Sequence, residues 1–302
     1  MVDVVVVGTV ALDDVKTPFG EVKNALGGSA TFASLACSLF SKVGLVAVIG
    51  NDFPEKHIDF LASKKIDLKG LERDKARKSF HWSGEYGLDL NVAKTLRTDL
   101  NALETFSPKL PEEYRKADFL FLGNLDPEIQ LNVLAQMKKR PSMVVADTMN
   151  LWIELKREKV LQVVKEVDIA LMNDAEARQL FRTPSLVRAA REILSLDSKV
   201  AIIKKGEHGC VMFTDKKHFA CPGYPLEKVI DPTGSGDSFG GALIGYLART
   251  RDFTEKNMRK GIVYASSVAS FNAEAFSTEK LSKISEADVR KRYREFKGFV
   301  RF

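Results

Sequence analysis

The stretch Asp231–Ala242 reads Asp-Pro-Thr-Gly-Ser-Gly-Asp-Ser-Phe-Gly-Gly-Ala. The segment Lys228–Ile230 before it is typical of a strand end, and the apolar spacing over Phe239–Leu247 predicts a helix. A strand, a glycine-rich turn and a helix in this order direct backbone N–H groups and the positive end of the helix dipole to one point. Gly234 and Gly236 permit backbone conformations that other residues avoid, so an anion can approach the main chain closely. The stretch therefore predicts an anion-binding turn.

Asp237 lies in the first turn of the expected helix, at the rim of this turn. A carboxylate beside an anion site suits phosphoryl transfer, in which the acid accepts a proton from the attacking hydroxyl. The alternative is that Asp237 only caps or charges the helix N-terminus. No Gly-Lys-Ser/Thr follows the glycines, and the spacing does not match the dinucleotide-binding pattern G-x-G-x-x-G. The spacing alone therefore indicates phosphate binding and leaves catalysis open.

Length and composition are those of an ordinary globular protein. The 302 residues are 45% hydrophobic and 28% charged, which suffices for one large α/β domain or two smaller ones. The apolar runs are short and no basic and apolar leader opens the chain, so we expect a cytoplasmic protein without a membrane partner. The net charge of +6 suits anionic ligands, but without a dense basic run we expect no nucleic-acid binding. Cys37, Cys210 and Cys221 are too few and too scattered for a disulfide framework or a zinc site.

Short apolar strands alternate with helical patterns along most of the chain. The expected strands are Val2–Val7, Leu45–Ile49, Ile66–Leu71, Phe119–Leu122, Met143–Ala146, Ile169–Met172 and Val200–Lys204, with a hairpin of Cys210–Phe213 and His218–Ala220. The expected helices are Ala30–Leu39, Pro54–Ser63, one from Pro127, Thr254–Asn272 and Ser285–Phe296. This alternation predicts a doubly wound, mainly parallel α/β sheet with helices on both faces. Polar residues follow the strands, where open α/β sheets bind ligands; examples are Asp13, Asp14, Asp147 and Asn173.

The segment Lys75–Phe106 has a different pattern, in which polar and apolar residues alternate without helical periodicity. It predicts antiparallel strands that act as a lid or an edge contact, and Thr17–Asn24 is expected to join them in a small sheet. We therefore expect a single domain over residues 1–302, with the small sheet formed by about 14–25 and 75–106. Exposed Phe80, Trp82 and Tyr86 at its edge would be a liability for a monomer, so we expect a homodimer through this sheet.

Taken together, these motifs resemble those of the ribokinase/PfkB carbohydrate kinases. Asp231–Asp237 resembles the second family signature, D-T-x-G-A-G-D, and Gly27-Gly28 with the strand ending Ile49–Asp52 resembles the first. Three further motifs also occur in the family's order along the chain: the opening Val7-Gly8-x4-Asp13, the motif Asn173-x-x-Glu176 and the turn Lys205–Gly209. The resemblance covers essentially the whole chain and implies a ribokinase-like fold in which Lys75–Phe106 is part of a β lid.

The resemblance also implies roles for the residues of the anion-binding turn. Asp237 would be the general base that takes a proton from the attacking hydroxyl. Backbone N–H groups of Gly234, Ser235 and Gly236 would stabilise the charge that develops on the transferred phosphoryl group. Asp13, Gly28 and Phe32 would lie at the acceptor substrate, with Asp13 and Gly28 contacting its hydroxyls.

Further residues are implied at the nucleotide and at metal ions. ATP would be the phosphate donor, with Asn173, Lys204, Gly206, Gly209 and Thr233 along the nucleotide. Glu176 would help to place Mg²⁺, through water, because Mg²⁺ keeps much of its hydration. Asp231, with Thr233 and the loop Ser270–Ser277, matches the position at which many members bind a monovalent cation such as K⁺.

Two positions depart from the family pattern. Phe32 stands where the first signature usually has Asn, and Ala11 stands two residues before Asp13, where ribokinase-like members have Asn. The loss of two polar contacts favours a nucleoside or another acceptor with an aromatic group. Alternatively, Phe32 packs within its helix, and small-sheet residues bind a sugar; these would be Trp82, Glu85, Tyr86, Asp89 and Asn91.

The leading hypothesis is an ATP-dependent kinase that phosphorylates a hydroxyl of a small carbohydrate-like substrate. A nucleoside kinase of the same fold, with an adenosine-like substrate, is the first alternative. A non-catalytic sensor of nucleotide or sugar is the second.

Overall fold

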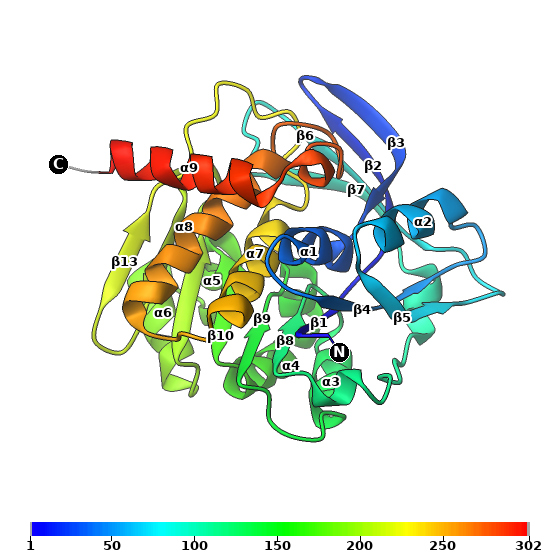
Figure 1. Cartoon of the computed structure of the whole chain (residues 1–302), viewed down its shortest axis with the longest axis horizontal. Helices are drawn as coiled ribbons and strands as arrows, with labels where there is room; N and C mark the ends of the chain where they lie inside the picture. The colour runs from blue at the N-terminus through cyan, green and yellow to red at the C-terminus, as the bar shows by residue number, and fades with distance from the viewer. Residues whose placement is uncertain (1, 301–302) are drawn as a thin grey trace.

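The computed structural model describes residues 2–300, and its strands form two sheets. The larger sheet has nine strands in the order β13-β12-β11-β10-β9-β8-β1-β4-β5 (Figure 1). In chain order these are β1 (Val4–Val7), β4 (Val43–Ile49), β5 (Asp67–Arg73), β8 (Phe119–Leu122), β9 (Met143–Ala146), β10 (Ile169–Asn173), β11 (Val200–Lys204), β12 (Cys210–Phe213) and β13 (His218–Cys221). All neighbouring strands are parallel except β11-β12 and β12-β13, which are antiparallel. The predicted sheet, including its hairpin, is confirmed.

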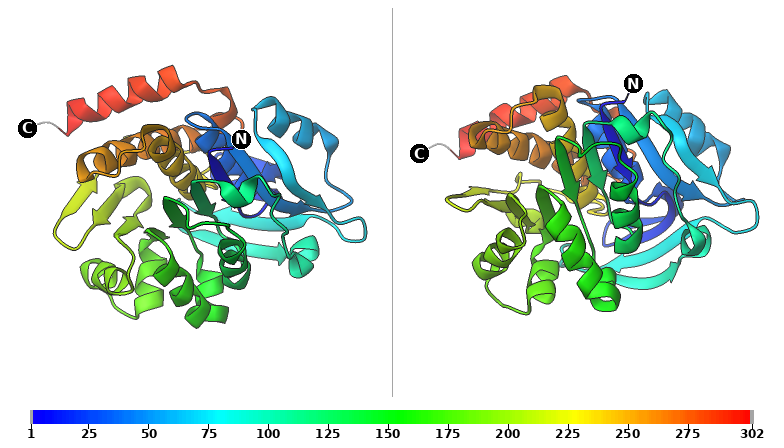
Figure 2. Two further views of the ribbon diagram at one scale, coloured as in Figure 1. Left: turned by 60° about the horizontal axis from the view of Figure 1, so that its bottom comes forward. Right: turned by 90° about the horizontal axis from the view of Figure 1, so that it is seen from below.

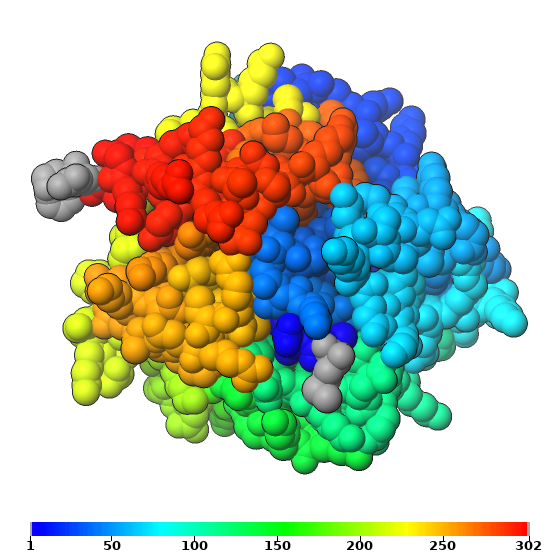
Figure 3. Space-filling model, in the orientation of Figure 1, coloured from blue at the N-terminus to red at the C-terminus, as the bar shows by residue number. Residues whose placement is uncertain are grey.

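Helices cover both faces of this sheet (Figure 2). On one face lie α1 (Ser29–Ser38), α2 (Glu55–Ser63), α7 (Ser235–Thr250), α8 (Glu255–Asn272) and α9 (Glu286–Phe299). On the other face lie α3 (Pro127–Ala135), α4 (Asn150–Glu166), α5 (Asp174–Phe181) and α6 (Leu186–Ser195). The space-filling view of the first face shows α9 (red) lying over α8 (orange) (Figure 3). No helix within residues 2–300 is long and apolar enough to cross a membrane.

The strand β1 shows how the sequence builds two cores. All four of its valines are fully buried, because strands β4 and β8 flank it and helices cover both faces. Val4 and Val6 belong to the apolar cluster under α1 and α7, whereas Val5 and Val7 belong to the cluster under α3 to α6. Alternate side chains of one strand therefore serve opposite faces.

Small residues let α1 and α7 pack closely at the centre of the first face. A Cβ atom on Gly241 would lie 2.1 Å from the carbonyl oxygen of Ala33, and one on Gly245 would lie 3.0 Å from the sulfur of Cys37. Cys37 is fully buried in this contact, as expected for a packing residue. These small residues thus bring the start of α7 close to α1.

The smaller sheet has the order β3-β2-β6-β7, with β2 (Ala11–Thr17), β3 (Gly20–Gly27), β6 (Phe80–Tyr86) and β7 (Ala93–Asp99). The predicted small sheet is confirmed, and β6 and β7 are antiparallel as expected. Strand β2 begins at Ala11, earlier than the predicted limit of about residue 14, so both Asp13 and Asp14 lie within it. Short 3₁₀ helices follow at Asn101–Thr105, Tyr114–Lys116, Gly206–His208 and Leu281–Lys283.

Two expectations from the sequence are wrong. Lys228–Ile230 is not a strand; instead, the N–H of Ile230 donates to the carbonyl of Ala273, 2.8 Å away at the end of α8. The segment is short, and Pro232, two residues after Ile230, cannot donate to a ladder. Phe80, Trp82 and Tyr86 do not form an exposed edge, because they are half-buried and line a cavity between the two sheets.

Candidate active site

A cavity of about 310 Å³ lies where the carboxyl ends of the parallel strands meet the small sheet. It is lined by residues from β2, β6, β7, the starts of α1 and α7, the ends of β10 and β11, and the segments that follow β1, β8, β9 and β10. The predicted residues that line it are Asp13, Gly28, Phe32, Asn173, Glu176, Lys204, Thr233, Gly234, Gly236 and Asp237. A second cavity, of about 400 Å³, lies near the end of α3 and contains none of them.

Gly234 is the residue immediately before α7, and two features require it to be glycine. Its φ of 75° lies in the left-handed region, and a Cβ atom there would lie 2.3 Å from the ring of Phe32. Phe32 is 2% exposed, lines the cavity and packs with its ring against the turn at Gly234. Both interpretations of Phe32, helix packing and pocket wall, therefore describe part of its environment.

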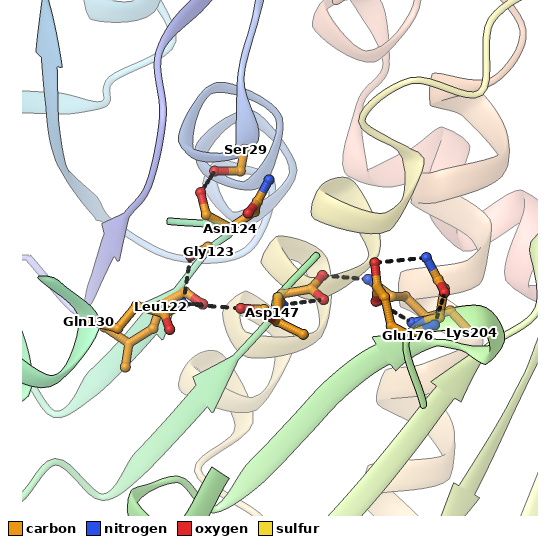
Figure 4. A network of polar contacts seen from close by, with 10 residues as sticks. Ser29, Leu122, Gly123, Asn124, Gln130, Asp147, Glu176 and Lys204 are labelled. Atoms are coloured by element: carbon orange, nitrogen blue, oxygen red, sulfur yellow. Dashed lines mark hydrogen bonds and ion pairs between the residues drawn. The ribbon is translucent and has the colours of Figure 1, made fainter. Parts of the chain in front are cut away.

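Lys204, the last residue of β11, lies against the same turn. Its ammonium nitrogen is 3.0 Å from the position that a Cβ atom on Gly236 would take, and it forms an ion pair with Asp147 (Figure 4). Burial disfavours the charged ammonium, but the carboxylates of Asp147 and Glu176 outweigh this effect and raise the pKa of Lys204. A positive charge thus lies beside the turn at Gly236.

Asp237 is half-buried at the cavity, in the first turn of α7. Desolvation and the negative charge of Asp147 raise its pKa, Lys204 opposes both effects, and the resulting pKa is about 7. A carboxyl group with this pKa exchanges protons near neutral pH, which is the property needed of a general base.

Asn173 and Glu176 form a reciprocal capping box at the start of α5. The carboxylate of Glu176 accepts hydrogen bonds from the backbone N–H of Asn173 at 2.7 Å and from its side-chain amide at 2.8 Å. Because burial disfavours its charge, the pKa of Glu176 is raised. Residues 2–300 hold no group of three or more His, Cys, Asp or Glu side chains that could bind a metal ion.

Asp13 on β2 also lines the cavity and is 6% exposed. Its Oδ1 atom is buried without a hydrogen-bond partner within the described chain. Desolvation, together with the charges of Asp231 and Asp237, raises the pKa of Asp13 to about 8. An unpartnered buried acceptor is costly, so this oxygen indicates a site for a ligand that donates hydrogen bonds.

The turn Lys205–Gly209 lies outside the cavity, so the structure does not bring Gly206 and Gly209 to its lining. Both have positive φ, 54° and 81°. A Cβ atom on Gly206 would clash with the side chain of Asn91, and the N–H of Glu207 donates to the same Asn91 oxygen at 3.1 Å. The loop between β6 and β7 therefore rests on this turn.

Asp231 is 1% exposed, and its carboxylate joins two segments. It accepts hydrogen bonds from the N–H of Thr233 at 2.9 Å and from the N–H of Ser277 at 3.0 Å. Asn272 donates from its side chain to the carbonyl of Thr233 at 2.7 Å and to the hydroxyl of Ser235 at 3.2 Å. The loop Ser270–Ser277 thus lies beside Asp231. Ser235, which was expected at the transferred phosphoryl group, does not line the cavity.

The sequence did not assign roles to Asn124, Asp147 and Trp152, which also line the cavity. Asp147 and Asn124 follow β9 and β8, and a polar residue at a strand's carboxyl end was the signal available. Gln130 holds both strand ends together, because its side-chain amide donates to the carbonyls of Gly123 and Asp147 at 2.9 and 3.0 Å (Figure 4). Trp152 carried no signal in the sequence.

Comparison with known proteins supplies the family context. A family model described as pfkB family carbohydrate kinase matches residues 1–284. A cytidine kinase of Thermococcus kodakarensis is 30% identical over 259 residues, which are 84% of this chain and 92% of that protein. Among solved structures, a nucleoside kinase of Burkholderia thailandensis in complex with inosine has a TM-score of 0.80 and 17% identity, and the match covers 98% of each chain. A fructokinase double mutant of Vibrio cholerae with fructose, ADP and potassium ion bound has a TM-score of 0.79 and 18% identity, covering 96% of this chain and 97% of that one.

Proposed function

Because this chain belongs to the PfkB family of carbohydrate kinases, a family of phosphotransferases with an alcohol group as acceptor, we propose that it phosphorylates the primary hydroxyl of a nucleoside with ATP. The observation that carries the choice of a nucleoside is the apolar wall of the cavity. This wall comprises Phe80, Leu100, Leu103, Leu125, Leu151 and Trp152, which belong to or pack against one hydrophobic cluster. A nucleobase would bury this wall, whereas a free sugar would leave it without an apolar partner. The cytidine kinase relative supports the same choice.

In the proposed complex, Asp13 and Gly28 bind the ribose hydroxyls. The free oxygen of Asp13 provides the acceptor for them. Asp237 takes the proton of the attacking hydroxyl, and the N–H groups of Gly234, Ser235 and Gly236 stabilise the transferred phosphoryl group.

On the nucleotide side, Lys204, Asn173 and Thr233 bind phosphates, and the turn with Gly206 and Gly209 lies along the rest of the nucleotide. Mg²⁺ would enter with the nucleotide beside Glu176 and neutralise phosphate charge. Both oxygens of Glu176 accept hydrogen bonds within the capping box, so this residue suits contact through water.

Asp231 is the proposed neighbour of a monovalent cation, because it joins the turn to the loop Ser270–Ser277. The buried side-chain oxygen of Asn272, which has no hydrogen-bond partner within the described chain, adds an acceptor in this region. If a cation binds there, replacing K⁺ with tetramethylammonium at constant ionic strength lowers the turnover number. Equal turnover in both salts would remove this site from the proposal.

We also propose a homodimer through the small sheet. The edge strand β7 is exposed, and Leu88, Val92 and Leu96 project apolar side chains into solvent at exposed fractions of 97%, 64% and 53%. Leu96→Glu should convert the dimer to a monomer in sedimentation experiments. A monomeric wild-type protein at assay concentration would contradict this contact.

The experiment that tests the function is ADP release from Mg-ATP with a panel of acceptors. The panel contains cytidine, uridine, adenosine and inosine. It also contains ribose, fructose and a sugar acid, which represent the carbohydrate-like acceptors expected from the sequence. The matched control is each nucleoside without its 5′-hydroxyl, which must give no ADP. Turnover with sugars alone would overturn the nucleoside assignment, and nucleotide binding without any turnover would favour a sensor.

A further inference from the structure

In the ion pair between Asp147 and Lys204, hydrogen bonds hold Asp147 in place. The backbone of Asp147 is held by its N–H, which donates to Leu122 at 2.9 Å, and by its carbonyl, which accepts from Gln130 at 3.0 Å. The N–H of Thr148 donates to Oδ1 of Asp147 at 3.0 Å, so Oδ2 is the oxygen that faces Lys204. Asp147 is 4% exposed. A rigid, buried carboxylate therefore determines where the ammonium lies (Figure 4).

The position of this ammonium matters because several carboxylates compete for it. The groups that face one another around Asp237 are Asp13 from β2, Tyr86 from β6, Asp147 after β9, Glu176 from α5 and Lys204 from β11. Lys204 is the single cation in this set. If it paired with Asp237, the ammonium would stabilise the carboxylate, and Asp237 would become a weaker base.

From this geometry we infer that Asp147 is a positioning residue, which holds the Lys204 ammonium against the phosphate-binding turn and away from Asp237. Within the described chain, Asp147 is the hydrogen-bond acceptor of this ammonium, which leaves two of its three N–H groups for phosphate oxygens. Gly236 provides the space, since a side chain there would meet the ammonium. The inference deepens the proposed phosphoryl transfer and rests on it.

The variants Asp147→Asn and Lys204→Met test this inference through opposite shifts of the pH–rate profile. Asp147→Asn removes a negative charge and frees Lys204 to approach Asp237, so the acid limb of kcat/KM for the nucleoside should move to lower pH. Lys204→Met removes the positive charge, so the same limb should move to higher pH. At the pH optimum, each variant should lose roughly tenfold to a hundredfold in kcat, the cost of one hydrogen bond to a charged group.

The double variant tests whether Asp147 acts through Lys204. If it does, Asp147→Asn adds little further loss of kcat in the Lys204→Met protein, whereas additive losses would overturn the inference. Asp147→Glu, which keeps the charge, should recover part of the activity and keep the acid limb near that of the wild type. If Asp147→Asn does not fold, the limb positions of Asp147→Glu and Lys204→Met still decide the question.

Asp168→Asn is the matched control. Asp168 is 5% exposed and pairs with Lys199 at 2.7 Å, but it lies just before β10, at the end of the strand away from Asn173. This variant should lower thermal stability and leave the acid limb in place. A loss of activity in Asp147→Asn without a shift of the limb would mean a merely structural role and would refute the inference. Absence of turnover in the wild type would instead refute the proposed function.

Discussion

The phenol of Tyr86 on β6 lies 3.1 Å from the hydroxyl of Thr233, and this hydrogen bond joins the small sheet to the phosphate-binding turn. Burial raises the pKa of Tyr86, so its hydroxyl stays protonated. Because Thr233 lies directly before Gly234, a change in the position of the small sheet would also change the position of the turn.

Tyr86→Phe removes this hydrogen bond and keeps the aromatic ring. We expect a rise in KM for the acceptor. The activation free energy that corresponds to kcat/KM should increase by about 0.5–1.5 kcal/mol, the contribution of one neutral hydrogen bond. Steady-state kinetics with each substrate varied in turn measure it. The matched control is Thr95→Val, which removes a bond from the indole of Trp82 to Thr95 within the same sheet. Equal effects of both variants would show that the bond to Thr233 has no special role.

Asp237→Asn tests the proposed base. It should fold normally and bind nucleotide, but lose ~10²–10⁴-fold in turnover, the range for loss of a general base. Circular dichroism and calorimetric titration with ATP establish folding and binding. In the wild type, turnover should rise with pH through about 7, because Asp237 must be deprotonated to accept a proton. Undiminished turnover in the variant would exclude Asp237 from the chemistry.

Gly234 and Gly236 should respond differently to alanine. Gly234→Ala places a Cβ atom at positive φ against Phe32, so the free energy of unfolding should fall by about 1–3 kcal/mol. Gly236 lies within α7, where alanine is favoured over glycine, so Gly236→Ala should keep its stability and raise KM for ATP by displacing Lys204. Calorimetry and kinetics on both variants check this contrast, and destabilisation by Gly236→Ala would contradict it.

Asp13 should make stability depend on pH. Its pKa is raised in the folded state, so its protonated form is stabilised; the favourable contribution is complete below about pH 4 and is lost as pH rises through about 8. Asp13→Asn removes this loss. The melting temperature of the variant relative to wild type should therefore increase between pH 5 and pH 9. A constant difference across that range would mean that Asp13 does not titrate as described.

Much of this fold was predictable from the sequence, because buried parallel strands read as continuous apolar runs. Val4–Val7 and the glycine turn at Gly234 are examples in which local pattern and tertiary structure agree. Lys228–Ile230 was mistaken for a strand because three residues carry no periodicity, and its real partner, Ala273, is distant in sequence.

The site was less predictable than the fold. Asp147 is an ordinary strand-end residue until the sheet order places β9 near β11 and Lys204. The alternation of Phe80, Trp82 and Tyr86 indicated one face of a strand, but alternation does not reveal whether that face meets solvent or the second sheet.

Nucleoside phosphorylation is tested most directly by identifying the product by ³¹P NMR after incubation with Mg-ATP and cytidine, in parallel with adenosine and ribose. We predict a nucleoside 5′-monophosphate and an equal amount of ADP, both reduced in Asp237→Asn. A sugar phosphate as the sole product would contradict the nucleoside assignment, and the absence of any phosphorylated acceptor would contradict the kinase proposal.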